Sequence, residues 1–310
     1  MSLFNKGKVL VTGGAGFIGS HQVDALIAAG YKVVIVDNLS SGQEANLNPD
    51  AEFYKVDVRE EKLREVFEKE KPDFVFHFAA QINVNHSVED PIFDADVNII
   101  GSLNVLEQCV TFKVKKIMFA STGGALYGEA EVVPTPEKYP CEPKSPYGIA
   151  KLAVEKYIRF YRARFGLEFG ITRYSNVYGP RQNPKGEAGV ISIFAQKLLD
   201  GMTPTIHGDG HQTRDYVYVG DVVAANMAVL ESEKSGTYNV GTGRQTTVNE
   251  TYGLVAGKVG VNLEPKYSED FSGQRVSCLS CEKIKTKLGW VPETELEDGI
   301  EKTVEWFRSK

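Results

Sequence analysis

A tyrosine and a lysine lie four residues apart in the segment SPYGIAK, and together they could carry acid–base chemistry. Ser145 can cap a helix and Pro146 fits its first position, which would place Tyr147 and Lys151 on one helix face. A free phenol, with a pKa near ~10, is a weak base at neutral pH, but a neighbouring ammonium favours the phenolate. Such a pair could act as a tuned general base. By itself, however, this spacing usually marks a solvated helix face, so the interpretation needs support from the rest of the chain.

A glycine-rich turn, TGGAGFIGSH, follows the first β-branched run and precedes an apolar helical pattern. Gly13, Gly16 and Gly19 suit a dinucleotide site, because the turn is tight, the backbone approaches a pyrophosphate and the helix packs closely on the strand. The N-terminus of that helix, which includes Phe17 and Ile18, adds unpaired N–H groups and the positive end of a dipole. A glycine triplet alone is weak evidence, but its place between a strand and a helix predicts a dinucleotide site.

An acidic residue, Asp37, ends the second expected strand. A carboxylate there can accept hydrogen bonds from both ribose hydroxyls of the adenosine and repels a 2′-phosphate, which predicts NAD rather than NADP. Asn38 is assigned to the same site. Asp57 and Val58 end the third strand and are candidates for contact with the adenine edge.

The first half of the chain alternates short β-branched runs with longer helical patterns, which is typical of parallel βαβ units. Several of the runs are almost continuously apolar, so helices should cover both faces of the sheet. Strands are expected at residues 8–13, 32–37, 52–57, 73–79, 116–121 and 169–174. Helices are expected at 17–29, 60–70, 91–112 and 146–165. The predicted fold class is α/β, a Rossmann-type doubly wound parallel sheet with a smaller C-terminal substrate-binding domain.

The alternation of strand and helix patterns ends at Asn176, where the segment NVYGPRQNPKGEAG is rich in glycine, proline and asparagine. We therefore expect an NAD-binding domain over 1–176, with a return segment near 215–243. A substrate-binding lobe is expected over 177–214 and 244–310. Shorter elements are expected as a helix at 190–200, a strand and helix at 215–231, and two or three helices from 249 onward with a loop near SEDFSGQRVS.

Composition and charge exclude several classes of protein. Of the 310 residues, 42% are hydrophobic and 25% charged, which is ordinary for a globular protein. A formal net charge of -6 without a basic stripe argues against nucleic-acid binding. Because the sequence shows neither a leader-like segment nor an apolar stretch of ~20 residues, we expect no membrane association and a cytoplasmic location. The four cysteines fit neither a disulfide framework nor a zinc motif, so Cys278 and Cys281 are expected to be structural and no metal is expected.

The chain resembles the extended short-chain dehydrogenase/reductase family, and within it the UDP-glucose (UDP-galactose) 4-epimerases. The resemblance covers essentially the whole chain and rests on an ordered series: GGAGFIGSH, DNLSSG, HFAAQ, NIIGSLNVLE, STGGALYGE, YGIAK, RYSNVYGPRQ and TRDYVYVGD. It implies a tightly held NAD, a Tyr147 phenolate tuned by Lys151 that takes the proton of the sugar 4-hydroxyl, and reversible hydride transfer through a 4-keto sugar. It also implies a UDP-sugar substrate and a homodimer with a helical seam in 91–112 and 146–165.

One stretch departs from the family pattern. Well-known members carry three serines, the third bonded to the sugar hydroxyl, where this chain has Ser121, Thr122 and Gly123. Thr122 is the candidate replacement and Ser121 the second, although Thr122 could equally be only the end of a strand. The resemblance further places four residues near the nicotinamide: Phe78, Ala79, Ala80 and Tyr174.

The resemblance assigns the sugar nucleotide to the second lobe, where guanidinium groups match phosphate oxygens in geometry and charge. The residues at matching positions are Asn176, Val190, His207, Arg214 and Arg275. The two arginines are expected at the diphosphate, and His207 stands where relatives stack an aromatic ring on uracil. Ser277 lies near the position where a bulky residue narrows the sugar pocket in some relatives, so a small residue there predicts tolerance of N-acetylated sugars.

Several other functions stay open from the sequence. A nucleotide-sugar 4,6-dehydratase shares the fold, NAD and the Tyr/Lys pair, but relatives with that activity carry Asp-Glu where this chain has Gly124 and Ala125. A UDP-glucuronate decarboxylase or epimerase has no distinctive feature here. A non-catalytic NAD-binding scaffold is opposed by the presence of both Tyr147 and Lys151. The sequence therefore favours an isomerase, an NAD-dependent UDP-glucose/UDP-galactose 4-epimerase.

Overall fold

The chain folds into two compact units, and the computed structural model describes residues 6–184, 189–270 and 273–310. Unit 1 comprises Met1–Leu126, Pro143–Arg173 and Asn226–Tyr238, and unit 2 comprises Tyr127–Glu142, Tyr174–Ala225 and Asn239–Lys310. This division differs from the expected domains in the segment 127–142 and in the narrower return at 226–238. The segment groups with unit 2 because the Tyr127 hydroxyl donates to Asn239 (2.9 Å) and the Thr135 N–H to the carbonyl of Cys278 (2.9 Å).

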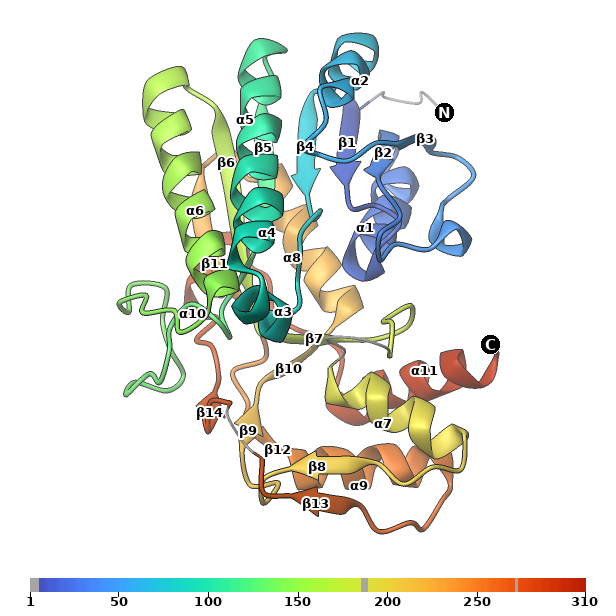
Figure 1. The fold of residues 1–310 in the computed structure, drawn as a ribbon. Coiled ribbons are helices and arrows are strands. Elements are labelled where there is room, and N and C mark those ends of the chain that lie inside the picture. Colours follow the sequence, from blue (N-terminus) through green and yellow to red (C-terminus); the bar gives the residue numbers. More distant parts are fainter. Residues whose placement is uncertain (1–5, 185–188, 271–272) are drawn as a thin grey trace. The chain divides into compact units, whose positions relative to one another are not determined.

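Unit 1 is built around a seven-stranded sheet with the order β11-β6-β5-β4-β1-β2-β3 (Figure 1). Its strands are β1 (Lys8–Thr12), β2 (Lys32–Asp37), β3 (Glu52–Lys55), β4 (Phe74–His77), β5 (Lys116–Thr122), β6 (Glu168–Tyr174) and β11 (Gly236–Val240). The pairs β1/β2, β1/β4, β2/β3 and β4/β5 are parallel, which confirms the predicted Rossmann-type sheet. The strand order reverses between β1 and β4, the point at which doubly wound sheets bind dinucleotides.

Helices cover both faces of this sheet. They are α1 (Phe17–Ala28), α2 (Lys62–Glu70), α5 (Gly101–Thr111), α6 (Pro146–Phe165) and α8 (Val219–Glu231), with a short 3₁₀ turn η1 (Glu44–Asn46). On one face, α2, α5 and α6 bury Phe67, Leu106 and Ile158 in the same core as Phe119 of β5. On the other face, α1 and α8 meet where the Asn226 side chain donates to Gln22 (3.1 Å).

The helix expected over 91–112 is confirmed as a helical run over 91–111, but it is not α-helical throughout. The chain forms α3 (Val84–Glu89), α4 (Pro91–Ala95) and a π-helical turn η2 (Asp96–Ile100) before α5 begins. Hydrophobic periodicity does not reveal such a widened turn, and π-turns are frequent at functional sites. The strand expected at 73–79 also ends early, at His77, because the chain leaves the sheet at Phe78 to pass close to the glycine turn.

Unit 2 contains three small sheets within the described residues: β7 with β10, β9 with β12 and β14, and β8 with β13. The strands are β7 (Asn176–Tyr178), β8 (Thr205–His207), β9 (Thr213–Arg214), β10 (Tyr216–Tyr218), β12 (Thr246–Thr247), β13 (Lys266–Ser268) and β14 (Val276–Ser277). The helices α7 (Val190–Leu199), α9 (Val248–Val259) and α11 (Leu296–Arg308) pack around a core that includes Phe194, Tyr252 and Val304, and α10 (Glu282–Leu288) precedes α11. The predicted tail helices are therefore confirmed. The expected loop near SEDFSGQRVS ends in β14 and includes residues 271 and 272, which lie outside the described residues.

Candidate active site

The glycine turn between β1 and α1 brings three pieces of backbone into close contact. Gly13 has a φ of +70°, and a Cβ there would lie 2.7 Å from the backbone nitrogen of Ala79. A Cβ at Gly19 would lie 2.1 Å from the carbonyl oxygen of Gly13. Gly16 precedes the first helical residue, Phe17, and its own N–H donates to Gly13 (3.1 Å). A side chain fits neither at Gly13 nor at Gly19, and such a close approach of the backbone at the N-terminus of a helix is what a dinucleotide diphosphate requires.

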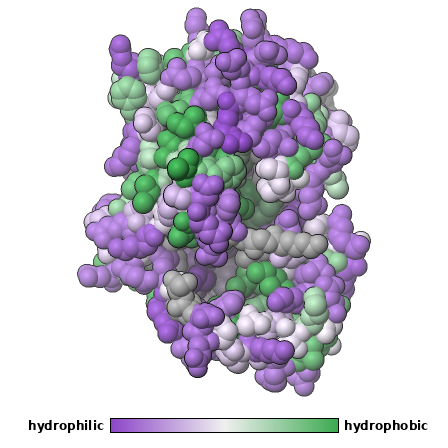
Figure 2. All heavy atoms as spheres, viewed as in Figure 1, coloured by the Kyte–Doolittle hydropathy of each residue, from purple (hydrophilic) through white to green (hydrophobic). Residues whose placement is uncertain are grey.

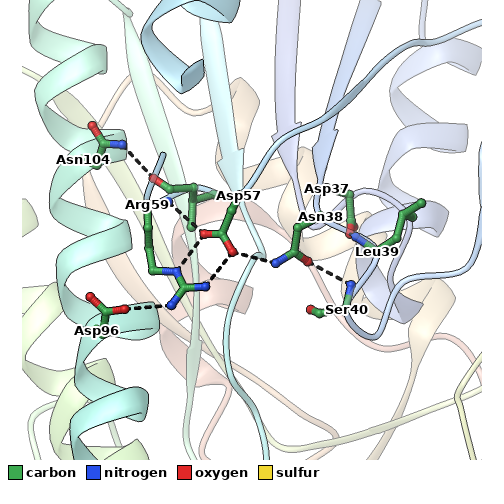
Figure 3. A network of polar contacts seen from close by, with 9 residues as sticks. Asp37, Asn38, Leu39, Ser40, Asp57, Arg59, Asp96 and Asn104 are labelled. Atoms are coloured by element: carbon green, nitrogen blue, oxygen red, sulfur yellow. Dashed lines mark hydrogen bonds and ion pairs between the residues drawn. The ribbon is translucent and has the colours of Figure 1, made fainter. Parts of the chain in front are cut away.

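Asp37 lies beside this turn at the carboxyl end of β2 (Figure 3). The residue is buried, and its carboxylate accepts the N–H of Ala15 (3.0 Å) and the N–H of Leu39 (2.8 Å). The backbone of the glycine turn therefore holds the carboxylate in one orientation. The turn and Asp37 together fit NAD, because they combine a diphosphate cradle with an acceptor for the adenosine ribose.

A second carboxylate, Asp57, stands next to this position but is already engaged (Figure 3). Arg59 donates to it from Nε (2.9 Å) and from its guanidinium NH2 (2.8 Å), and the Asn38 amide donates as well (2.7 Å). The hydrogen bonds from Arg59 outweigh burial and lower the pKa of Asp57 to about 2. Arg59 also reaches Asp96 of η2 (2.7 Å), a clamp that the sequence analysis missed because Asp96 is distant in sequence.

Of the residues expected at the cofactor site, the structure thus brings Asn38 and Asp57 together. Val58 is buried, and its carbonyl accepts the side-chain amide of Asn104 (2.7 Å). The adenine contacts of Asp57 and Val58 stay a prediction.

The predicted catalytic pair, Tyr147 and Lys151, lies at the start of α6, where the predicted capping is confirmed. Ser145 accepts the N–H of Gly148 (3.2 Å) and Pro146 occupies the first turn. The Lys151 ammonium donates to the carbonyl of Ala120 (3.1 Å) and lies 5.8 Å from the ring centre of Tyr147. Burial lowers the pKa of Lys151 to about 8, partly opposed by the negative charge of Asp94.

Gly148, between the two catalytic candidates, has a role that the sequence analysis missed. A Cβ at this position would lie 2.7 Å from the carbonyl oxygen of Ala125, which belongs to the loop after β5. Glycine therefore lets the start of α6 approach that loop closely. The glycine in YGIAK is visible in the sequence, but the reason for it, the close approach of the loop after β5, is visible only in the structure.

The two hydroxyls at the end of β5 have different surroundings. Ser121 is buried and donates to Glu155 of α6 (2.7 Å), and Glu155 forms a buried ion pair with Arg173 (2.6 Å). The Thr122 hydroxyl is partly exposed and accepts the N–H of Ala125 (3.2 Å). The Ser121 hydroxyl therefore donates its hydrogen bond to an internal carboxylate. The Thr122 hydroxyl acts as an acceptor in its hydrogen bond with Ala125 and can still donate one.

The segment after β4 carries the residues assigned to the nicotinamide. Phe78, Ala79 and Ala80 are all partly exposed, and the N–H of Ala79 donates to the Thr12 hydroxyl (3.2 Å). The ring of Phe78 stacks on Phe76 with centres 5.8 Å apart. Tyr174, the fourth residue, is the buried last residue of β6.

In unit 2, the three-stranded sheet brings together residues that are distant in sequence. Ser277 of β14 is the register partner of Arg214 in β9, and the N–H of Thr213 donates to the carbonyl of Arg275 (2.9 Å). The Arg275 guanidinium contacts Asp209 (3.1 Å). Burial lowers the pKa of Arg214, whose guanidinium donates to the carbonyl of Thr213 (2.8 Å). Two guanidinium-bearing residues and the small Ser277 thus share one edge of unit 2.

The other substrate candidates lie on separate elements of unit 2. Asn176 begins β7 and its N–H donates to the carbonyl of Asp215 (2.9 Å). Val190 is the first residue of α7. His207 is exposed at the end of β8, where its Nδ1 lies 3.1 Å from the Ser268 hydroxyl.

The cysteines do not form a reactive or metal-binding site in the described residues. All four are free thiols, and burial is the main cause that raises the pKa of Cys278 to about 12 and that of Cys281 above its usual range. Within the described ranges, no group of three or more His, Cys, Asp or Glu side chains could hold a metal ion.

A cavity of about 560 Å³ beside Cys281 and Trp290 includes none of the predicted site residues. Among the described helices, none is long and apolar enough to span a bilayer.

Known proteins match this chain along nearly all of its length. A putative UDP-glucose 4-epimerase of Methanocaldococcus jannaschii is 48% identical over 301 residues, which is 97% of this chain and 98% of that protein. The crystal structure of a UDP-glucose 4-epimerase from Thermotoga maritima with UDP-glucose superimposes with a TM-score of 0.96 at 50% identity, covering 97% of this chain and 99% of that one. The Thermus thermophilus UDP-glucose 4-epimerase in complex with NAD gives a TM-score of 0.92 at 44% identity, with coverage of 97% and 99%.

The family model described as the NAD dependent epimerase/dehydratase family matches residues 9–241. That range contains the glycine turn, Asp37 and the Tyr147–Lys151 pair. It exceeds half of the chain, and the full-length relatives agree with it. The chain therefore belongs to the NAD-dependent epimerase/dehydratase family.

Proposed function

We propose that this protein is an NAD-dependent UDP-glucose 4-epimerase, which interconverts UDP-glucose and UDP-galactose by inverting C4 of the hexose. The observation that carries the proposal is the Lys151 ammonium, 5.8 Å from the ring centre of Tyr147, in the same unit as a dinucleotide cradle. The relatives named above support the choice of sugar nucleotide, since they are UDP-glucose 4-epimerases.

The candidate site residues of unit 1 each have a defined task in this reaction. Tyr147 takes the proton of the sugar 4-hydroxyl at its phenolate oxygen and later returns it, and the Lys151 ammonium stabilises the phenolate. The glycine turn and Asp37 bind the dinucleotide. NAD, when bound, supplies a reversible hydride acceptor, which makes inversion at C4 possible.

Unit 2 provides the positive charge that the substrate's diphosphate requires. We propose that Arg214 and Arg275 bind its oxygens, since guanidinium groups match phosphates in geometry. Arg275 now contacts Asp209 and would exchange that carboxylate for the phosphate. Asn176, Val190 and His207 complete the proposed nucleotide site.

Thr122 is proposed as the hydroxyl that bonds to the sugar, because its proton is uncommitted whereas that of Ser121 goes to Glu155. Thr122→Val keeps the shape of the side chain and removes the hydroxyl. We expect kcat to fall roughly 10²-fold, the usual cost of one missing donor at a reacting centre. Steady-state kinetics with UDP-galactose measures this loss.

Ser121→Ala is the matched control. It leaves the buried Glu155 without one donor, so we expect the free energy of unfolding to fall by about 1–3 kcal/mol with a smaller effect on kcat than Thr122→Val has. A reversal, with kcat lost in Ser121→Ala and kept in Thr122→Val, would transfer the catalytic role to Ser121.

Ser277 supports a second substrate class, the N-acetylated UDP-hexoses. It is small and 9% exposed, and it stands opposite Arg214 in the sheet. Ser277→Tyr should lower kcat/KM for UDP-N-acetylglucosamine at least about tenfold while turnover of UDP-glucose is kept, because a bulky ring excludes the acetyl group. If the wild-type protein does not turn over the acetylated sugar, this extension of the substrate range is wrong.

A 4,6-dehydratase function is less well supported. Elimination of water needs an acid and a base besides Tyr147, and Gly124 and Ala125, which follow β5, can supply neither. The epimerase reaction needs no such additional groups.

We also propose a homodimer formed through unit 1. Figure 2 shows apolar side chains gathered over the face formed by α5 and α6. The exposed apolar side chains of α4, η2 and α6 include Ile92, Phe93, Ile100, Ile149 and Phe160. A patch of this kind is typical of an interface, and sedimentation analysis of the wild type and Ile149→Glu tests it.

A cytoplasmic location is part of the same proposal, supported by the four free thiols.

The proposed function is tested by incubating the purified protein with UDP-galactose, without added cofactor, and separating the products. UDP-glucose should form up to the equilibrium ratio. A 4-keto-6-deoxy product would show a dehydratase instead, and unchanged substrate would contradict the epimerase assignment.

A further inference from the structure

Asp94 is a buried carboxylate that the mechanism above does not use. It lies on α4 and is 1% exposed. Its Oδ1 accepts two hydrogen bonds, from Nε2 of Gln81 (2.8 Å) and from Nδ2 of Asn98 (2.9 Å). Its Oδ2 is also buried but accepts no hydrogen bond within the described part of the chain. A half-satisfied buried carboxylate is costly, so its presence calls for a functional explanation.

The surroundings of Asp94 fix its position closely. Asn98, on the π-turn η2, also exchanges two hydrogen bonds with the backbone of Gln81, at 3.0 Å and 2.9 Å. Gln81 directly follows the segment Phe78–Ala80. The network Gln81–Asp94–Asn98 therefore ties α4 and the π-turn to the loop assigned to the nicotinamide.

The adjoining helix α6 carries a buried cation, Lys151. Helix α4 packs against α6, which carries Lys151. Lys151 is 4% exposed, and its ammonium, besides its hydrogen bond to Ala120, lies over the ring of Phe119 at 4.9 Å. Burial lowers the pKa of Lys151 to about 8, and the charge of Asp94 acts in the opposite direction. Burial raises the pKa of Asp94, and Lys151 in turn opposes that change.

We propose that Asp94 is the fixed counter-ion of Lys151, a positioning residue that keeps the ammonium charged beside Tyr147. The inference rests on the proposed function only in taking Tyr147 as the base. A neutral lysine could not stabilise the phenolate, so the charge of Asp94 would set the highest pH at which the enzyme works.

The other titratable groups that adjoin Lys151 include a neutral histidine and several paired side chains. Burial, with a smaller contribution from Lys151, lowers the pKa of His77 to about 3, so this ring is uncharged. Further groups on adjoining elements include the proposed base Tyr147, Glu155 paired with Arg173, Asp96 paired with Arg59, and His86 close to Glu89 on α3.

Direct titration of Lys151 tests the proposal without any assay of turnover. The NAD-loaded protein is labelled with carbon-13 at the ε-carbon of lysine, and the Lys151 signal is identified by its loss in Lys151→Met. Asp94→Asn removes the charge but keeps an acceptor for Gln81 and Asn98. In Asp94→Asn, we expect the pH midpoint of the Lys151 titration to lie below that of the wild type. An unchanged midpoint overturns the proposal.

Glu89→Gln is the matched control, because it removes an acidic group from the adjoining helix whose side chain is 76% exposed. Its Lys151 midpoint should equal that of the wild type. Asp94→Glu, which keeps the charge, should restore the wild-type midpoint, and this variant also guards against a folding defect in Asp94→Asn. A midpoint in Asp94→Glu as low as in Asp94→Asn would show that packing, not charge, is responsible.

The pH profile of epimerisation gives the functional readout. In Asp94→Asn, kcat at pH 9 should fall roughly threefold to tenfold, with little change at pH 7, because Lys151 loses its proton earlier. A loss equal at both pH values would indicate a merely structural role and contradict the proposal. A wild-type protein without epimerase activity would refute the proposed function, while the lysine titration would still decide the role of Asp94.

Discussion

Tyr147→Phe is expected to lower kcat by about 10²- to 10⁴-fold while NAD stays bound. The change removes one oxygen atom, and with it the proposed base for the sugar hydroxyl. A loss of this size is the range that general-base catalysis usually contributes. Because the ring and its neighbour Lys151 stay in place, neither folding nor the dinucleotide cradle should change. Single-turnover kinetics and the NAD content of the purified variant measure both expectations.

Tyr157→Phe is the control for this experiment. It makes the same chemical change on the same helix, α6, but at a side chain that is 40% exposed and has no part in the proposed site. It should retain wild-type kcat. Near-normal turnover by Tyr147→Phe would mean that another group abstracts the proton.

Gly19→Ala should eliminate NAD binding and, with it, activity. A Cβ at this position would lie 2.1 Å from the carbonyl oxygen of Gly13, so α1 has to move away from the turn that holds the diphosphate. Overpacking of this kind costs about 1–3 kcal/mol of folding free energy. The bound-NAD content after purification and the thermal unfolding midpoint measure the two effects.

Gly253→Ala separates this steric effect from the general effect of adding a methyl group to a helix. A Cβ at Gly253 of α9 meets no atom within 4 Å. It should leave NAD content unchanged and raise stability by up to about 1 kcal/mol. If Gly19→Ala retained a full complement of NAD, the interpretation of the glycine turn would be wrong.

The parts of the site that could be predicted from the sequence are those encoded by local rules. The glycine turn and the cap formed by Ser145 and Pro146 depend on neighbouring residues, and the structure confirms the sheet, the cap and the start of α6. The helix–strand alternation likewise predicted the parallel sheet, since its period is a property of each segment alone.

The parts that could not be predicted depend on contacts between distant segments. The π-turn at Asp96–Ile100 widens a helical run whose apolar pattern looks uniform. The hydrogen bond from Ser121 to Glu155 joins residues 34 positions apart. The one from Arg59 to Asp96 joins residues 37 positions apart. Spacing rules cover only a few residues, so these partners become visible only once the sheet has placed the segments side by side.

In the proposed reaction, hydride leaves C4 and returns to the same carbon within one active site, and Tyr147 takes and returns the proton. The most direct test is conversion of UDP-galactose that carries deuterium at C4, in ordinary water and without added NAD. We predict UDP-glucose that retains the deuterium at C4, produced by the wild type and not by Tyr147→Phe. Loss of the deuterium to solvent during inversion would rule out this hydride-transfer mechanism.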